Sequence, residues 1–231
     1  MKNKKIFFKN YIIQIPLGLR VWQLIRAITL LRNKCFRDLF LEVKKEDICL
    51  DLGANIGFAS LVMWIKGVKH IYALEPNKEA FFELKKNLKG IRNITIFNMA
   101  ISSVTKKQKL FLHNSIKKKS ESNKILQHSQ SSSLLSDKSN IGDCYYEVNS
   151  IKLKELFNKL LMQPNIIKCD IEGGEYIIYK DLVEVPNSHN IRKIFVECHS
   201  DKYPQYQNLH KDFIEIIKDN NLEKIIDTTW H

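Results

Sequence analysis

Apolar residues follow two patterns along the chain, short continuous runs and longer stretches with helical spacing. The runs predict strands at residues 47–51, 70–74, 94–97, 165–169, 193–196 and 222–226. The stretches between them predict helices at residues 58–65, 78–88, 153–161, about 172–182, and 207–220. Strands that alternate with helices indicate an α/β sandwich with a mostly parallel sheet.

Residues 102–149 interrupt the alternation, because no long helical pattern lies there. Residues 109–113 and 145–148 look like strands, and a Lys- and Ser-rich stretch separates them. This composition favours a flexible insertion or lid within a domain that spans residues 45–231. We interpret Ser131 to Ser133 as plain loop rather than as a substrate contact.

The first 44 residues form a separate region, a basic helical arm. Apolar residues from Leu17 to Leu31 recur at helical spacing, and residues 1–37 hold nine Lys or Arg and no acid. The net charge of +12 comes largely from this arm. The arm either docks on the core or makes peripheral membrane contact through residues 1–37. No stretch has the length of a membrane span.

Composition is that of a globular protein, with 44% hydrophobic and 27% charged residues in 231. The five cysteines are odd in number and show no C-x-x-C spacing. A disulfide framework is therefore not expected, which indicates a reducing compartment. We expect a cytoplasmic protein, with a membrane-peripheral position as the alternative.

A glycine-bearing turn follows the first predicted strand, with the sequence Asp51-Leu-Gly53-Ala-Asn55-Ile-Gly57. In open α/β sheets, ligands bind at the carboxyl ends of strands. Asn55 stands where a dinucleotide fingerprint needs its second glycine, which disfavours a pyrophosphate cofactor. Glu75 ends the second strand, where a carboxylate binds ribose hydroxyls. An adenosine ligand without a pyrophosphate suggests S-adenosylmethionine.

Acidic residues and one histidine follow the fourth and fifth predicted strands, and they share the predicted edge of Asp51 and Glu75. They are Asp170, Glu172, Glu175, Glu197 and His199. So many acids together are costly unless they are paired, hydrogen-bonded or bound to a ligand or cation.

Together these motifs resemble the FkbM family of S-adenosylmethionine-dependent methyltransferases. The resemblance covers roughly residues 48–227 and rests on five segments, Asp51 to Gly57, Ala73-Leu-Glu-Pro76, Ala100-Ile-Ser102, Lys168-Cys-Asp-Ile-Glu-Gly-Gly-Glu175 and Val196-Glu-Cys-His199. It implies a class I methyltransferase fold, a Rossmann-like three-layer sandwich. It also implies O-methylation of a small or saccharide acceptor, plausible for surface polysaccharide or glycolipid modification.

The resemblance also implies roles for individual residues. The residues expected to bind the cofactor are Asp51, Gly53, Asn55, Gly57, Glu75, Pro76, Met99 and Ala100. Those expected to be catalytic are Asp170, Glu172 and His199, with Glu175 and Glu197 at the substrate. The class commonly ends with an antiparallel strand. This chain ends at His231, so that strand is predicted to be absent or the chain to be truncated.

Three mechanisms for the hydroxyl proton remain open. His199 is the natural general base, because its ordinary pKa lies near neutrality. In the second mechanism, Asp170 or Glu172 takes the proton or orients the histidine. A divalent cation on Asp170, Glu197 and His199 polarises the hydroxyl in the third. We expect no metal.

Two other functions compete with O-methylation. A nucleic-acid methyltransferase would suit the positive charge. However, Asp170-Ile-Glu172-Gly replaces the Asn/Asp-Pro-Pro-aromatic turn of amino-methylating enzymes, and its acids repel phosphates. We therefore expect no nucleic-acid partner. An inactive membrane-associated scaffold with the same fold is the other alternative, and the intact Asp51 and Glu75 argue against it.

Overall fold

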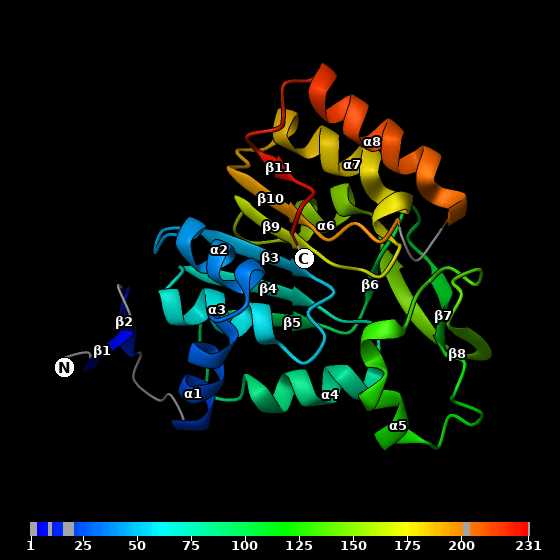
Figure 1. Cartoon of the computed structure of the whole chain (residues 1–231), viewed down its shortest axis with the longest axis horizontal. Coiled ribbons are helices and arrows are strands. Elements are labelled where there is room, and N and C mark those ends of the chain that lie inside the picture. Colours follow the sequence, from blue (N-terminus) through cyan, green and yellow to red (C-terminus); the bar gives the residue numbers. More distant parts are fainter. Residues whose placement is uncertain (1–3, 9–10, 16–20, 201–203, 231) are drawn as a thin grey trace.

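Six parallel strands form the central sheet of the computed structural model, which describes residues 4–8, 11–15, 21–200 and 204–230 (Figure 1). The strands lie in the order β11-β10-β9-β3-β4-β5, and every neighbouring pair is parallel. Their bounds are β3 (Ile48–Leu52), β4 (His70–Leu74), β5 (Ile94–Phe97), β9 (Ile166–Cys169), β10 (Lys193–Val196) and β11 (Ile226–Asp227). The prediction of an α/β fold with a mostly parallel sheet is confirmed.

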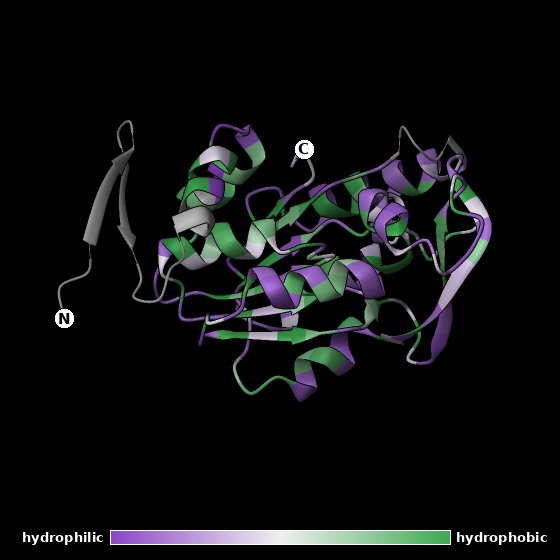
Figure 2. Ribbon diagram, turned by 90° about the horizontal axis from the view of Figure 1, so that it is seen from below, coloured by the Kyte–Doolittle hydropathy of each residue, from purple (hydrophilic) through white to green (hydrophobic). Residues whose placement is uncertain are grey.

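Helices cover both faces of the sheet and make three layers. Side chains alternate along each strand, so Leu50 and Leu74 pack with one layer of helices and Cys49 and Ala73 with the other. The first layer holds α6 (Leu153–Lys159), α7 (Glu175–Ser188) and α8 (Gln207–Asp219). The second holds α2 (Lys34–Glu42), α3 (Phe58–Lys66) and α4 (Lys78–Asn87). In Figure 2 the central strands are mostly hydrophobic.

The first strand of the sheet, β3, lies at its centre, and later strands are added on both sides of it. β3, β4 and β5 follow one another toward one edge, and β9, β10 and β11 toward the other. Such a reversal opens a space beside the carboxyl ends of the two central strands, here β3 and β9. The fold therefore places a binding site after Leu52 and Cys169.

The insertion forms its own small sheet. Strands β6 (Ala100–Ile101), β8 (Ile141–Ile151) and β7 (Lys107–His113) lie in that order, with β7 and β8 antiparallel. Between β7 and β8 come the short helix α5 (Ser122–Gln127) and the 3-10 turn η1 (Ser129–Ser131). The two predicted strands of the insertion are confirmed, and both are longer than predicted.

Two predicted element bounds differ from the structure for identifiable reasons. Helix α7 begins at Glu175 rather than near residue 172, because Glu172 and Gly173 have left-handed φ angles of +54° and +95°. Strand β11 begins at Ile226 rather than at residue 222. The amides of Ile225 and Ile226 both donate to the carbonyl of Leu222, so that segment is a turn. Beyond β11, Thr229 makes an antiparallel bridge with Glu197.

The N-terminal arm contains more than the predicted helix. A hairpin of β1 (Lys4–Phe8) and β2 (Tyr11–Ile15) comes first. Helix α1 (Val21–Leu30) lies within the predicted 17–31, of which residues 17–20 lie outside the described residues. Neither the hairpin nor α2 was predicted from the apolar pattern of the sequence. Leu39 and Phe40 of α2 are buried in the core.

Helix α2 also meets the other end of the chain. The indole Nε1 of Trp230 donates a hydrogen bond of 3.0 Å to the carbonyl of Cys35, and the ring packs edge-on against Phe36. A 3-10 turn, η2 (Pro204–Tyr206), leads into α8. Among the described residues, no helix is long and apolar enough to cross a membrane.

Candidate active site

The turn after β3 brings the backbone of two strands into close approach. Gly53 has a φ of +75°, and a Cβ on it would lie 1.8 Å from the carbonyl oxygen of Asp170. Any other residue there would push β3 and β9 apart. Gly57, with a φ of +93°, precedes α3, and a Cβ there would lie 2.8 Å from Leu84. Glycine is thus favoured by the left-handed φ at both positions, and at Gly53 the backbone contact with Asp170 also requires it.

Lys168, a residue of β9, binds this turn through its side chain. Its ammonium donates to the carbonyl of Gly53 at 2.8 Å, and it lies 3.2 Å from Asp51 and 3.6 Å from Asp170. Burial disfavours the ammonium, but the charges of Asp51 and Asp170 outweigh burial and raise the pKa of Lys168. Asp51 also accepts from the Ser60 hydroxyl at 2.6 Å. Asp51 is fully buried and supports the turn from beneath.

Glu75 follows β4 and is held rigidly. Its two carboxylate oxygens accept the backbone N–H groups of Asn55 and Asn77, each at 2.7 Å. Burial raises the pKa of Glu75 to about 7, although these two hydrogen bonds offset part of the effect. Each oxygen keeps a further lone pair for a ligand hydroxyl. Asn77 in turn caps α4 by accepting from the amides of Glu79 and Ala80.

A cavity of about 240 Å³ lies at this edge of the sheet. Residues from the turn after β3, the ends of β4, β9 and β10, the start of β6 and the insertion line it. They include Gly53, Asn55, Glu75, Pro76, Met99, Ala100, Ser129, Gln130, Ser132, Ser133, Asp170, Glu172 and Glu197. The cavity thus joins the predicted cofactor residues to three of the predicted acids.

Four predicted residues do not line the cavity. Asp51 and Gly57 support the turn from outside it, and Glu175 and His199 lie behind its acidic wall. Both Glu175 and His199 are almost fully buried. The structure therefore places these four residues around the cavity rather than at its surface.

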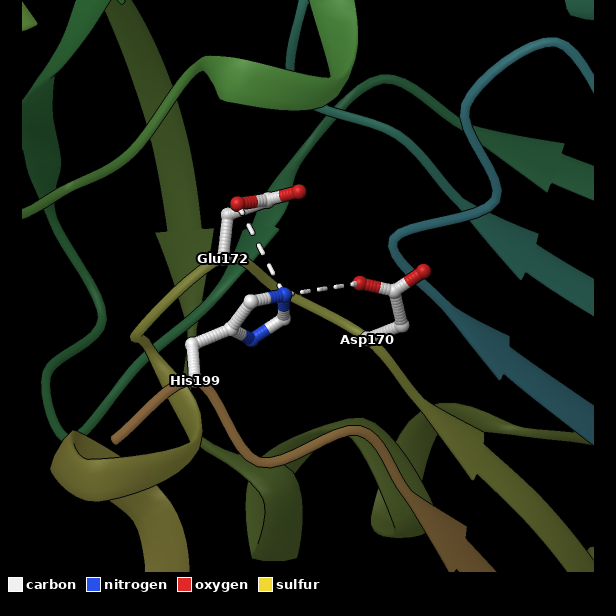
Figure 3. A group of neighbouring side chains, drawn as sticks. All are labelled: Asp170, Glu172 and His199. Atoms are coloured by element: carbon white, nitrogen blue, oxygen red, sulfur yellow. Dashed lines mark ion pairs between the residues drawn. The ribbon is translucent and has the colours of Figure 1, made fainter. Parts of the chain in front are cut away.

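His199 faces three carboxylates. Its Nε2 lies 3.5 Å from Glu197, 3.7 Å from Glu172 and 3.9 Å from Asp170, and Figure 3 shows the ring pointing between Asp170 and Glu172. Its Nδ1 lies 2.8 Å from Glu175. Burial would lower the pKa of His199, but the hydrogen bond and charge of Glu175, with Glu172 and Asp170, raise it to about 8.

Serines of the insertion close the cavity from above. Ser129 bonds to the side chain of Asn55 at 3.2 Å, and Ser132 accepts from the side-chain amide of Asn77 at 2.9 Å. The Ser133 hydroxyl donates to the carbonyl of Glu172 at 2.7 Å. Ser132 and Ser133 thus line the cavity and hold the insertion to it, while the interpretation of Ser131 to Ser133 as loop rather than substrate contact stays a prediction. Their partners lie on elements distant in sequence, so no local pattern marks them.

A lysine fixes the same segment to the acidic wall. The ammonium of Lys138 lies 2.6 Å from Glu172 and also donates to the carbonyl of Ser131 at 3.2 Å. The side chain of Lys138 is 1% exposed. A buried pair of this kind holds the insertion in one position over the cavity. Lys138 could not be singled out from the sequence, because one Lys among many carries no local signal.

The family comparison covers most of this domain. Residues 51–223 match the model of the methyltransferase FkbM domain. The chain therefore belongs to the FkbM methyltransferase family, and it is an S-adenosylmethionine-dependent methyltransferase with a class I, Rossmann-like fold. Comparison with curated proteins gave no match.

Several solved structures are similar to the chain in fold. A precorrin-6y C5,15-methyltransferase from Geobacter metallireducens GS-15 is 14% identical, with a TM-score of 0.42, over 89% of this chain and 74% of that one. Trm5b from Pyrococcus abyssi is 10% identical, with a TM-score of 0.37, and the match covers 95% of this chain and 47% of that one. TYW2 from P. horikoshii, in complex with MeSAdo, is 16% identical, with a TM-score of 0.27, and the match covers 42% of this chain and 36% of that one. These likenesses are too remote to indicate a substrate.

Proposed function

We propose that the chain transfers the methyl group of S-adenosylmethionine to a hydroxyl of a small or saccharide acceptor. One observation carries the proposal: Asp170, Glu172 and Glu197 line the same cavity as Glu75. Carboxylates accept hydrogen bonds from hydroxyl groups and repel phosphates. An acidic wall beside the predicted cofactor residues therefore suits a polyhydroxylated acceptor better than a nucleic acid.

The cavity residues fit the cofactor. Gly53 and Asn55 of the turn after β3 line the cavity, and Glu75 offers fixed acceptors for ribose hydroxyls. Met99 and Ala100 lie on the same wall as Glu75, where they would flank the adenine. When bound, S-adenosylmethionine supplies a sulfonium methyl, so that one S–C bond breaks, one O–C bond forms and S-adenosylhomocysteine is left.

The chain's own residues position the acceptor and remove its proton. Asp170 and Glu172 hold the acceptor hydroxyl, and a carboxylate of the cavity wall takes the proton as the oxygen is methylated. His199 lies behind this wall, and its contact with Glu175 fixes the ring. Lys138 and the serines of the insertion restrict water at the reacting groups.

The acceptor class is tested by transfer of a radiolabelled methyl group. Purified protein is incubated with labelled S-adenosylmethionine and, separately, with simple glycosides, capsule-type oligosaccharides, glycolipids, transfer RNA and duplex DNA. We expect label in a saccharide or glycolipid fraction and none in the nucleic acids. Asp170→Asn should abolish this transfer, while Glu184→Gln, an exposed acid on α7, should not. Labelling of nucleic acid alone would overturn the proposal.

We infer that the protein acts in the cytoplasm on a surface-polysaccharide or glycolipid intermediate, with the basic arm at an anionic membrane. All five cysteines are free thiols in the structure, in keeping with a reducing compartment. Arg26 of α1 is exposed and stacks over Phe58 at 4.3 Å. Vesicle flotation tests the arm: binding to phosphatidylglycerol vesicles that high salt removes is expected. Equal recovery with neutral vesicles would contradict it.

A further inference from the structure

The ring of His199 presents a buried nitrogen that has no hydrogen-bond partner among the described residues. His199 is 1% exposed, and Nε2 is the unpartnered atom. Glu175 contacts the other nitrogen, Nδ1, at 2.8 Å. Because a carboxylate only accepts, Nδ1 donates its proton to Glu175, and Nε2 is the ring atom that points at the acidic wall. A buried nitrogen that faces carboxylates without a hydrogen-bond partner is stabilised by positive charge, which either a proton or a bound cation supplies.

We propose that Asp170, Glu172 and Nε2 of His199 bind a divalent metal cation. One ligand atom from each residue lies within 4.8 Å of the other two, as the ligands around one ion do (Figure 3). Two carboxylate oxygens with one imidazole suit Mn²⁺ and related first-row ions. The contact between Nδ1 of His199 and Glu175 is also typical of a metal site, since metal-binding histidines commonly donate their second N–H to a carboxylate.

The charges around the site favour a cation. Five carboxylates gather here, and within the described part of the chain the ion pairs bring two ammonium groups to them. The carboxylates belong to Asp51, Asp170, Glu172, Glu175 and Glu197, and the ammonium groups to Lys138 and Lys168. A divalent ion would add positive charge where these carboxylates meet. The cation site considered from the sequence has Glu197 beside Asp170 and His199, whereas the group in the structure has Glu172 in that place.

Lys138 competes with the cation for one ligand. Its ammonium lies 2.6 Å from Oε2 of Glu172, the oxygen that also lies 3.7 Å from Nε2 of His199. Removing this positive charge removes a competitor for the carboxylate of Glu172. Lys138→Met should therefore strengthen metal binding, whereas general damage to the fold would weaken it. This opposite sign makes Lys138→Met the most informative variant.

The chemical role of the ion deepens the proposed function and rests on it. A cation here would take the acceptor hydroxyl as a further ligand and lower the pKa of its O–H bond. The proton would pass to Glu197, a cavity-lining carboxylate outside the ligand set. The hydroxyl oxygen then forms the O–C bond as the S–C bond of the sulfonium breaks, leaving S-adenosylhomocysteine.

The test is a titration of the full chain with Mn²⁺, in which electron paramagnetic resonance monitors binding. Free Mn²⁺ gives a strong signal that decreases on binding, and spin-echo modulation detects a coordinated imidazole nitrogen. We expect saturable binding with nitrogen modulation in the wild type. His199→Gln and Asp170→Asn should weaken binding about 10- to 100-fold, and Lys138→Met should tighten it about 10-fold. His70→Gln, at the opposite end of β4, is the control and should leave binding unchanged.

Two results would overturn the metal site. One is the lack of Mn²⁺ binding at millimolar concentration by a protein that binds S-adenosylhomocysteine. The other is binding without nitrogen modulation that His199→Gln leaves unchanged. Titration with S-adenosylhomocysteine alone separates this proposal from the proposed function. Cofactor binding without metal binding rejects only the metal site, and metal binding without cofactor binding rejects the methyl donor.

Discussion

Oε1 of Glu175 accepts two hydrogen bonds from one residue, the ring Nδ1 of His199 at 2.8 Å and its backbone N–H at 3.0 Å. The second oxygen of Glu175 accepts the amide of Gly173 at 2.9 Å. Glu175 is fully buried at the first position of α7. It thereby fixes the histidine ring against the strand ends that carry the acidic wall.

Glu175→Gln tests this positioning role. The amide keeps the size of the side chain but loses its charge and one acceptor, so the ring of His199 loses its fixed orientation. We expect the methyl-transfer rate to decrease about 10- to 100-fold, with the dissociation constant of S-adenosylhomocysteine unchanged. Transfer kinetics and calorimetric titration measure the two effects. A proportional loss of cofactor affinity would instead mean that the residue only holds the fold together.

Gly53→Ala tests the close approach of β3 and β9. The new Cβ would meet the carbonyl of Asp170 at 1.8 Å, in addition to the strain of a φ of +75°. Gly90→Ala is the matched control, because its φ is +94° and nothing lies within 4 Å of its Cβ. We expect Gly90→Ala to cost about 1–2 kcal/mol of unfolding free energy, and Gly53→Ala clearly more. Urea denaturation measures both, and equal losses would contradict the close approach.

Glu75 should make the stability of the cofactor-free protein depend on pH. Burial raises the pKa of Glu75 to about 7, above that of an unfolded glutamate. The folded state therefore binds this proton more tightly, so the stabilising contribution is complete below about pH 4 and is lost as pH rises through about 7.

Glu75→Gln cannot titrate, so it should remove this contribution, on the order of 3 kcal/mol, from the pH profile. Unfolding free energies of wild type and Glu75→Gln between pH 5 and 8 provide the comparison. Parallel profiles would show that Glu75 is already ionised at low pH. Cofactor binding should have the opposite trend, strengthening toward pH 8, because the ionised carboxylate is the better acceptor for ribose hydroxyls.

Ser133→Ala tests whether the insertion is a built part of the cavity. The hydroxyl of Ser133 is buried and donates to the carbonyl of Glu172 at 2.7 Å, so its loss removes this link between the insertion and the acidic wall. We expect faster amide exchange over residues 129–138 and about 10-fold weaker binding of S-adenosylhomocysteine. Ser136→Ala, on the exposed part of the same segment, is the control. If both variants exchange like the wild type, the insertion does not depend on this contact.

The sheet could be predicted from the sequence, because buried parallel strands are short apolar runs and the turn residues between them are distinctive. Element bounds were less predictable. The start of α7 depends on the left-handed angles of Glu172 and Gly173, and the segment before β11 on a turn around Leu222. The short α2 and the β1–β2 hairpin gave no clear period.

The site was predictable where chemistry follows strand ends, as for Glu75 and Asp170. The site was not predictable where tertiary contacts decide which residues reach the cavity. Ser132 and Lys138 reach the cavity only because the insertion folds back over it. In the same way, the sequence cannot show that His199 lies behind the acidic wall or that Glu175 binds its ring.

The most direct test of the account is calorimetric titration of the wild type and of Glu75→Ala with S-adenosylmethionine and S-adenosylhomocysteine. We expect one site per chain in the wild type and loss of binding in the variant, with its fold verified by circular dichroism. Absence of binding by a folded wild-type protein would contradict the account and favour a scaffold that has lost turnover. Equal binding by Glu75→Ala would place the cofactor elsewhere.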